Sequence, residues 1–142
     1  MNVLLVCTGN TCFSVMAEGV LADMADRFAL PIVTRSAGTE AAEDTKPTRE
    51  CMMVMETMDI DVSAHRAHRL TEADVEWADS ILCMTQRTRA RILEKWPVAW
   101  PKVEALPHVL DDPYGQSYDG YMNIMNELRV MMLQWCHERK ML

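Results

Sequence analysis

The segment Val3-Leu-Leu-Val-Cys-Thr-Gly-Asn-Thr-Cys-Phe-Ser14 decides how this chain folds. Its aliphatic start predicts a buried strand over 2–6, residues 7–13 predict a loop, and the segment 15–30 has the apolar spacing of a helix. A strand, a short loop and a helix start form an anion cradle, because the loop N–H groups and the positive end of the helix dipole face one space. A cysteine at the first loop position, Cys7, is placed where a thiolate is favoured over a thiol. These residues predict a phosphate-like anion held against a nucleophilic sulfur.

Strand and helix patterns alternate along the rest of the chain. Further strands are expected at 32–37, 80–84 and 103–106, and further helices at 48–58, 71–77, 86–95 and 117–139. Residues 59–69 read as irregular, 96–101 as a rigid loop and 107–118 as a loop. This order predicts a single α/β domain over 1–142, a doubly wound four-stranded parallel sheet with helices on both faces. Ligands of such sheets bind at the carboxyl ends of strands, where the Cys7 loop and the loop carrying Asp112 are expected.

Composition limits the partners and the compartment. The chain has 142 residues and a formal net charge of −7, which argues against nucleic acid or an anionic membrane as the main partner. No apolar run approaches the roughly 20 residues of a membrane span, and the chain begins directly with a strand pattern, so no signal peptide is expected. Five cysteines in such a chain indicate reduced thiols and a cytoplasmic protein.

Three segments together resemble the low-molecular-weight protein tyrosine phosphatases. The first runs over 3–21 and contains Val-Cys-Thr-Gly-Asn-Thr-Cys, Ser14 and Met-Ala-Glu-Gly-Val-Leu. The family signature reads Cys-x5-Arg-Ser or Thr, usually followed by Pro. The segments Arg35-Ser-Ala-Gly38 and Asp112-Pro-Tyr114 are also similar to family motifs. The resemblance therefore covers essentially the whole chain and implies the fold of that family.

Two positions depart from the family signature. Phe13 stands where the family has its phosphate-binding arginine, and Val15 stands where it usually has Pro. Phosphoryl transfer depends mainly on positioning and charge stabilisation, and a charged clamp is worth about 10³–10⁵ in rate. Phenylalanine has no donor and no charge, so we expect impaired activity and weak phosphate affinity. Its ring either lies in the cradle and makes it apolar, or swings outward and leaves the loop open.

The resemblance implies a hydrolase that removes phosphate from protein phosphotyrosine or phosphoarginine through a cysteinyl-phosphate intermediate. It assigns the nucleophile to Cys7 and the general acid to Asp112, while Ser14 either caps the helix or donates to the sulfur. Pro113 stiffens the acid's loop, and Asp111 is expected to face solvent. The remaining residues of the phosphate-binding loop are then Thr8, Gly9, Asn10, Thr11, Cys12 and Phe13.

Substrate choice is assigned to Thr11 and Tyr114, which are expected to line the pocket. Within the family a threonine at the Thr11 position goes with phosphoarginine enzymes, and the run Asp112-Pro-Tyr-Gly-Gln-Ser117 resembles the same subgroup. The implied partner is a phosphorylated protein, and no metal or cofactor is implied. The four histidines are dispersed, without metal-ligand spacing.

Two alternative functions remain open on the sequence. A pseudophosphatase that binds a phosphorylated partner without turnover is favoured by Phe13, whereas the presence of Asp112 favours activity, since a pure binder needs no acid. A redox sensor would use a Cys7–Cys12 disulfide, as the family often does to protect its nucleophile; Cys12 is equally consistent with an inert loop thiol.

Cations elsewhere in the chain are potential substitutes for the missing arginine. Arg35 begins a family motif and is interpreted as structural, while Arg66 and Arg69 could reach over the pocket. The arginine-rich helix expected over 86–95 is interpreted as a solvated face, with a partner-docking face as the alternative.

Overall fold

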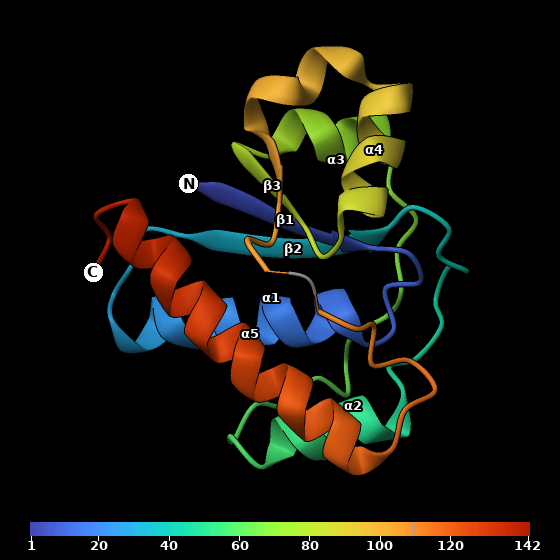
Figure 1. Ribbon diagram of the computed structural model, residues 1–142, viewed down its shortest axis with the longest axis vertical. Helices are drawn as coiled ribbons and strands as arrows, with labels where there is room; N and C mark the ends of the chain where they lie inside the picture. The colour runs from blue at the N-terminus through green and yellow to red at the C-terminus, as the bar shows by residue number, and fades with distance from the viewer. Residues whose placement is uncertain (109) are drawn as a thin grey trace.

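A computed structural model describes residues 1–108 and 110–142 and shows one parallel sheet (Figure 1). Its strands are β1 (Asn2–Cys7), β2 (Val33–Gly38), β3 (Ser80–Cys83) and β4 (Val103–Ala105), in the order β2-β1-β3-β4. The predicted four-stranded parallel sheet is confirmed. The register pairs Cys7 with Gly38 and Val6 with Cys83, so neighbouring strands end at the same edge. Residue 109, within the predicted loop 107–118, lies outside the described residues.

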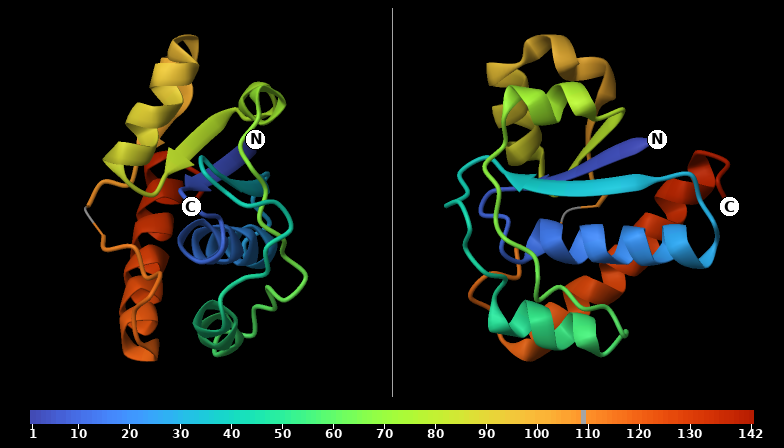
Figure 2. Two further views of the ribbon diagram at one scale, coloured as in Figure 1. Left: turned by 90° about the vertical axis from the view of Figure 1, so that its right-hand side faces the viewer. Right: turned by 180° about the vertical axis from the view of Figure 1, so that it is seen from behind.

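Helices cover both faces of the sheet, as predicted. The helices α1 (Phe13–Arg27), α2 (Arg49–Glu56) and α5 (Tyr118–Glu138) lie on one side. The helices α3 (Glu72–Trp77) and α4 (Gln86–Lys95) and the 3₁₀ helix η1 (Pro97–Lys102) lie on the other (Figure 2). Alternate residues of β1 point to opposite faces, so Leu4 and Val6 join the core under α4 while Leu5 and Cys7 join the core on α1.

Several predicted boundaries differ from the structure. Phe13 and Ser14 belong to the first turn of α1, because the helix begins directly at the end of the loop with Cys12 as its N-cap. The helix ends at Arg27, before the predicted residue 30, and Ala29 then adopts a positive φ of 52°. The predicted helix 48–58 is shorter, with Thr48 as its N-cap rather than its first residue.

The predicted rigid loop over 96–101 is wrong. Residues Pro97–Lys102 form η1, because proline at the first position fits a helical φ and Ala99 N–H donates to the Trp96 carbonyl at 3.0 Å. Thr71 and Asp74 form a capping box at the start of α3, and Thr85 caps α4. No helix within the described residues carries an apolar stretch long enough to cross a membrane.

Candidate active site

Loops that follow β1, β2 and β4 enclose a cavity of about 470 Å³ at the carboxyl edge of the sheet. The β1 loop supplies the floor of the cavity with residues 7–12. The β2 loop contributes residues between 40 and 48, and the loop before α5 contributes Asp112 and Tyr114. The structure therefore brings together Cys7, Thr11, Asp112 and Tyr114, which the sequence had assigned to one site.

The carbonyl groups of the β1 loop accept hydrogen bonds from the backbone of the segment that follows β2. Thr39 N–H donates to Cys7 O at 2.9 Å, Glu40 N–H to Thr8 O at 2.9 Å, and Thr48 N–H to Thr11 O at 3.0 Å. Because these carbonyl groups are bonded elsewhere, the loop is left to present N–H groups to the cavity, as an anion site requires. Gly38 permits this packing, since a Cβ there would lie 2.5 Å from the Thr8 carbonyl oxygen.

The sulfur of Cys7 lies among hydrogen-bond donors. The Ser14 hydroxyl is 2.9 Å from Cys7 Sγ, and Asn10 N–H donates to the same sulfur at 3.2 Å. Ser14 also accepts a hydrogen bond from Asn10 Nδ2 at 2.9 Å, so its single hydroxyl hydrogen is free to point at the sulfur. Of the two roles that the sequence left open for Ser14, the structure excludes helix capping and places the hydroxyl in hydrogen-bond contact with Cys7 Sγ.

Asn10 fixes the centre of the loop, and sequence reasoning missed the partners that hold it. Its side chain is fully buried, and its φ of 55° lies in the left-handed region that asparagine tolerates. Nδ2 donates to Ser36 Oγ at 3.0 Å, and Oδ1 accepts from His68 N–H at 2.9 Å. His65 Nε2 donates to the Asn10 carbonyl at 2.9 Å. The motif Arg35-Ser-Ala-Gly38 was the available signal for Ser36; nothing in the sequence pointed to the histidines.

The hydrogen bonds of the loop lower the pKa of Cys7 as predicted, but the expected net preference for a thiolate is not found. Burial raises the pKa of the Cys7 thiol above its ordinary value, and hydrogen bonds from Ser14 and Asn10 oppose this rise without overcoming it. The nearby Asp112 carboxylate adds a smaller rise. The donors for a thiolate are in place, but Phe13 supplies no positive charge to offset burial.

Phe13 adopts neither of the two conformations considered from the sequence. It is only 1% exposed and belongs to the core cluster shared by β1, α1 and α5. Phe13 is not one of the described residues that line the cavity. The ring therefore does not swing outward and does not line the cradle, because burial of its apolar surface in the core is favourable.

Asp112 lies at the mouth of the cavity, opposite the loop. Its Oδ1 accepts from Tyr114 N–H at 3.0 Å, and the Cys12 thiol is 3.6 Å from the same oxygen. The Asp112 side chain thus faces the loop, whereas Asp111 is exposed and does not line the cavity. Tyr114 is 68% exposed, so its ring stands at the rim rather than in the interior.

None of the three arginines that the sequence offered as a substitute clamp lines the cavity. Arg35 stacks on Trp77 with its guanidinium carbon 4.1 Å from the ring centroid, and Arg66 donates to the Ser63 and His65 carbonyls. Arg69 lines a different groove. Among the described residues Lys46 is the one cation in the lining, and it shares the rim with the carboxylates of Glu40 and Asp112. Sequence reasoning had not singled out Lys46.

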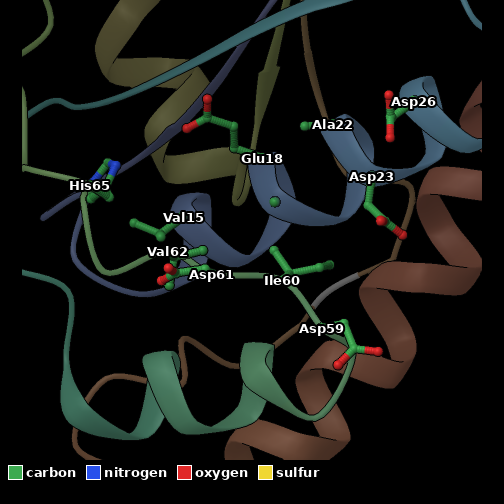
Figure 3. A pocket seen from close by; sticks show the side chains of 11 residues that line it. Val15, Glu18, Ala22, Asp23, Asp26, Asp59, Ile60, Asp61, Val62 and His65 are labelled. Carbon is green, nitrogen blue, oxygen red and sulfur yellow. The ribbon is translucent and has the colours of Figure 1, made fainter.

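A second cavity of about 500 Å³ lies between α1 and the segment after α2 and does not contain Cys7 (Figure 3). Its lining is strongly acidic, and Figure 3 shows its carboxylates on both sides; they are Glu18, Asp23, Asp26, Asp59 and Asp61. Its contact with the first site is indirect, through His65 and the Asn10 carbonyl. An anionic substrate would be repelled there, which leaves the Cys7 cavity as the candidate active site.

Comparison with known proteins agrees with this geometry. Residues 2–141 match the family described as low molecular weight phosphotyrosine protein phosphatase. A protein-arginine-phosphatase of Bacillus subtilis is 32% identical, with 99% of this chain and 97% of that protein covered. The protein-arginine-phosphatase of Geobacillus stearothermophilus is also 32% identical, over 92% of this chain and 90% of that protein. The structure of a low molecular weight protein tyrosine phosphatase from T. tengcongensis superposes with a TM-score of 0.94 at 30% identity, covering 97% of this chain and 99% of that one.

Proposed function

Because the chain belongs to the low molecular weight phosphotyrosine protein phosphatase family, we propose that it hydrolyses phosphorylated protein side chains through a phosphocysteine at Cys7. The observation that carries this proposal is the placement of Cys7 and Asp112 on one cavity, with the Ser14 hydroxyl 2.9 Å from the sulfur. The absence of an arginine at position 13 limits the rate, since a charged clamp is worth about 10³–10⁵.

The reaction divides into two steps. The thiolate of Cys7, formed by loss of the thiol proton to solvent, attacks phosphorus while the bond from phosphorus to the leaving oxygen or nitrogen breaks, and Asp112 gives its proton to that leaving atom. Loop N–H groups hold the non-bridging oxygens. Water then attacks phosphorus, the P–S bond breaks, and the Asp112 carboxylate accepts a proton from the water. The products are the unmodified side chain and inorganic phosphate, with Cys7 regenerated.

Phosphoarginine is the substrate we infer. Its guanidinium group brings positive charge to the phosphoryl group, and the lining of the cavity includes the carboxylate of Glu40. The aromatic ring of phosphotyrosine gains no such attraction. Thr11 lines the cavity, in line with the subgroup expectation from the sequence, and two similar proteins are named protein-arginine-phosphatases.

Lys46 is our candidate for the charge that the missing arginine would supply. It is exposed at the rim, so a flexible ammonium group replaces a bidentate fork and stabilises the phosphoryl group less well. Free thiols at all five cysteines fit a reducing compartment, and we place the protein in the cytoplasm on that ground.

Steady-state hydrolysis of p-nitrophenyl phosphate, a phosphotyrosine peptide and a phosphoarginine peptide tests the proposal. We expect slow turnover that is lost in Cys7→Ser, is faster on phosphoarginine, and falls about 10²–10³-fold on the peptides in Asp112→Asn. Lys46→Ala should lower kcat/KM by about tenfold or less, with Arg129→Ala as the matched cation control on α5. Turnover that survives in Cys7→Ser would refute a phosphocysteine mechanism.

One observation favours a second candidate function, a pseudophosphatase that binds a phosphorylated partner. Phe13 is buried in the core, and burial raises the pKa of Cys7, so both the clamp and the thiolate are weakened. That function predicts a phosphate-dependent rise in melting temperature without turnover, and strong turnover once Phe13→Arg restores the clamp.

A further inference from the structure

A basic groove of about 430 Å³ lies between α4 and the segment that leads from residue 66 into α3. Its charged and aromatic lining consists of Arg69, Arg91, Glu94, Lys95 and Trp96. We propose that this groove binds an acidic peptide segment that flanks the phosphorylated residue of a protein substrate. The inference rests on the proposed function and adds to it a preference for substrates with acidic sequence beside the phosphorylated side chain.

Charge is the first argument. Three cations and one carboxylate line the groove, whereas the whole chain has a formal net charge of −7. Arg69 and Lys95 have no carboxylate within ion-pair distance among the described residues, and Lys95 lies over the Trp96 ring at 5.0 Å from its centroid. The helix α4, interpreted from sequence as a solvated face, thus presents two of its cations to a concave surface.

Continuity with the active site is the second argument. Thr39 lines the groove, and the next residue, Glu40, lines the Cys7 cavity. Arg91 in the groove is bonded to Glu40 at the cavity, with 2.6 Å between Nη1 and Oε1. The two hollows therefore share a wall, and a peptide with its phosphorylated side chain over Cys7 enters the groove by passing the Arg91–Glu40 pair.

One residue of the groove lining has a buried hydroxyl oxygen without a hydrogen-bond partner. Thr39 Oγ1 is the one buried side-chain nitrogen or oxygen among the described residues that has no hydrogen-bond partner. Trp96 adds an apolar surface on which a peptide can pack.

The remaining charges give the bound peptide a direction. The acidic cavity of Figure 3 lies on the α1 side of the sheet, while the basic groove lies on the α4 side. An acidic flank is repelled from the first and attracted to the second. Nucleic acid is the weaker fit, because its many phosphates would meet few cations on a chain of net negative charge.

Binding of an unphosphorylated probe tests the groove apart from catalysis. A short glutamate-rich peptide and its glutamine counterpart are titrated into the protein, and amide and tryptophan indole signals are followed by NMR. We expect shifts at Thr39, Arg69 and residues 91–96 with the acidic peptide alone, weakened by salt. Arg69→Ala and Lys95→Ala should each reduce the affinity about two- to fivefold, whereas Arg87→Ala, on the same helix but outside the groove lining, should not.

Kinetics supply the second readout. For a phosphoarginine peptide with an acidic flank, Arg69→Ala and Lys95→Ala should each raise KM and leave kcat unchanged. Neither variant should change the hydrolysis of p-nitrophenyl phosphate. Absence of shifts in the groove, or an equal loss of affinity in Arg87→Ala, would overturn the inference, as would stronger binding of single-stranded DNA to the same residues. Groove binding without any turnover would instead refute the proposed function and leave the acidic-segment site standing.

Discussion

The side-chain nitrogen of Asn10 lies 2.9 Å from the hydroxyl oxygen of Ser14 and donates a hydrogen bond to it. Because Nδ2 can only donate, the Ser14 oxygen accepts, and its own hydrogen is available to Cys7 Sγ. Asn10 also donates to the sulfur directly through its backbone N–H. A residue with no assigned chemical step therefore prepares the nucleophile, which leads to the first two predictions.

Ser14→Ala should make Cys7 less reactive. Removal of the hydroxyl donor raises the pKa of Cys7 further, because a bond that stabilises the thiolate is lost while burial remains. We expect alkylation of Cys7 by iodoacetamide at neutral pH, followed by peptide mass spectrometry, to slow about tenfold. Ser63→Ala, an exposed serine, serves as the control. An unchanged Cys7 rate would show that the hydroxyl does not donate to the sulfur.

Asn10 variants should separate backbone strain from hydrogen bonding. Asn10→Gly keeps the positive φ but loses the bonds to Ser14, Ser36 and His68 N–H, so unfolding in urea should show a loss of about 2–3 kcal/mol. Asn10→Ala should lose about 1 kcal/mol more, because alanine disfavours the left-handed region. Asn126→Ala, on the exposed face of α5, should have little effect. Equal losses for Gly and Ala would argue against a strain contribution.

The reactivity of Cys7 should keep increasing with pH above the pH range in which an ordinary thiol ionises. The pKa of Cys7 is raised by burial, so the thiolate forms only as pH increases past the usual value, and the alkylation rate should still be increasing there. The same shift stabilises the fold below the unfolded-state pKa, and this contribution is lost as pH rises through the folded-state pKa. In Phe13→Arg a nearby cation should move the rate profile to lower pH. Coincident profiles for both proteins would contradict this assignment.

The Cys12→Ser substitution should change the response of the protein to peroxide and leave its binding of phosphate unchanged. Peroxide oxidises Cys7 to a sulfenic acid, and attack by the Cys12 thiol then releases water and forms a disulfide that dithiothreitol reduces. In Cys12→Ser the oxidation proceeds further, so recovery with dithiothreitol should fall, with Cys136→Ser as a buried control. Burial and the Asp112 charge raise the pKa of Cys12, so disulfide formation should be slow. Full recovery in Cys12→Ser would leave Cys12 as an inert thiol.

Local patterns in the sequence were sufficient for most elements. Alternating strand and helix signals predicted the four-stranded parallel sheet, and the Thr71 and Thr85 caps were predictable because a cap involves residues three apart in sequence. The failures have local causes as well. Phe13 was assigned to the loop, and Ser14 was a candidate cap rather than a helical residue, because no capping side chain marks the start of α1. The tryptophan- and proline-rich segment before β4 reads as a loop, although the proline at position 97 also suits a 3₁₀ turn.

The site was predictable only where residues carry a motif. Cys7, Thr11, Asp112 and Tyr114 meet at one cavity as expected, since parallel strands place their following loops at one edge. Lys46, His65 and Ser36 were missed, because their roles depend on contacts with the loop from segments more than twenty residues away. No sequence spacing reports such contacts.

The sequence by itself determined the fold and the absence of an arginine at position 13, because each is carried by a local pattern or by the identity of one residue. It also supplied the nucleophile and the acid on which the proposed function rests. Tertiary structure alone decided where the Phe13 ring lies and the direction in which the pKa of Cys7 shifts. It also decided which cations face the cavity and which face the groove beside it. Burial and charge at a point are sums over everything packed around it, and those neighbours are brought together only by folding.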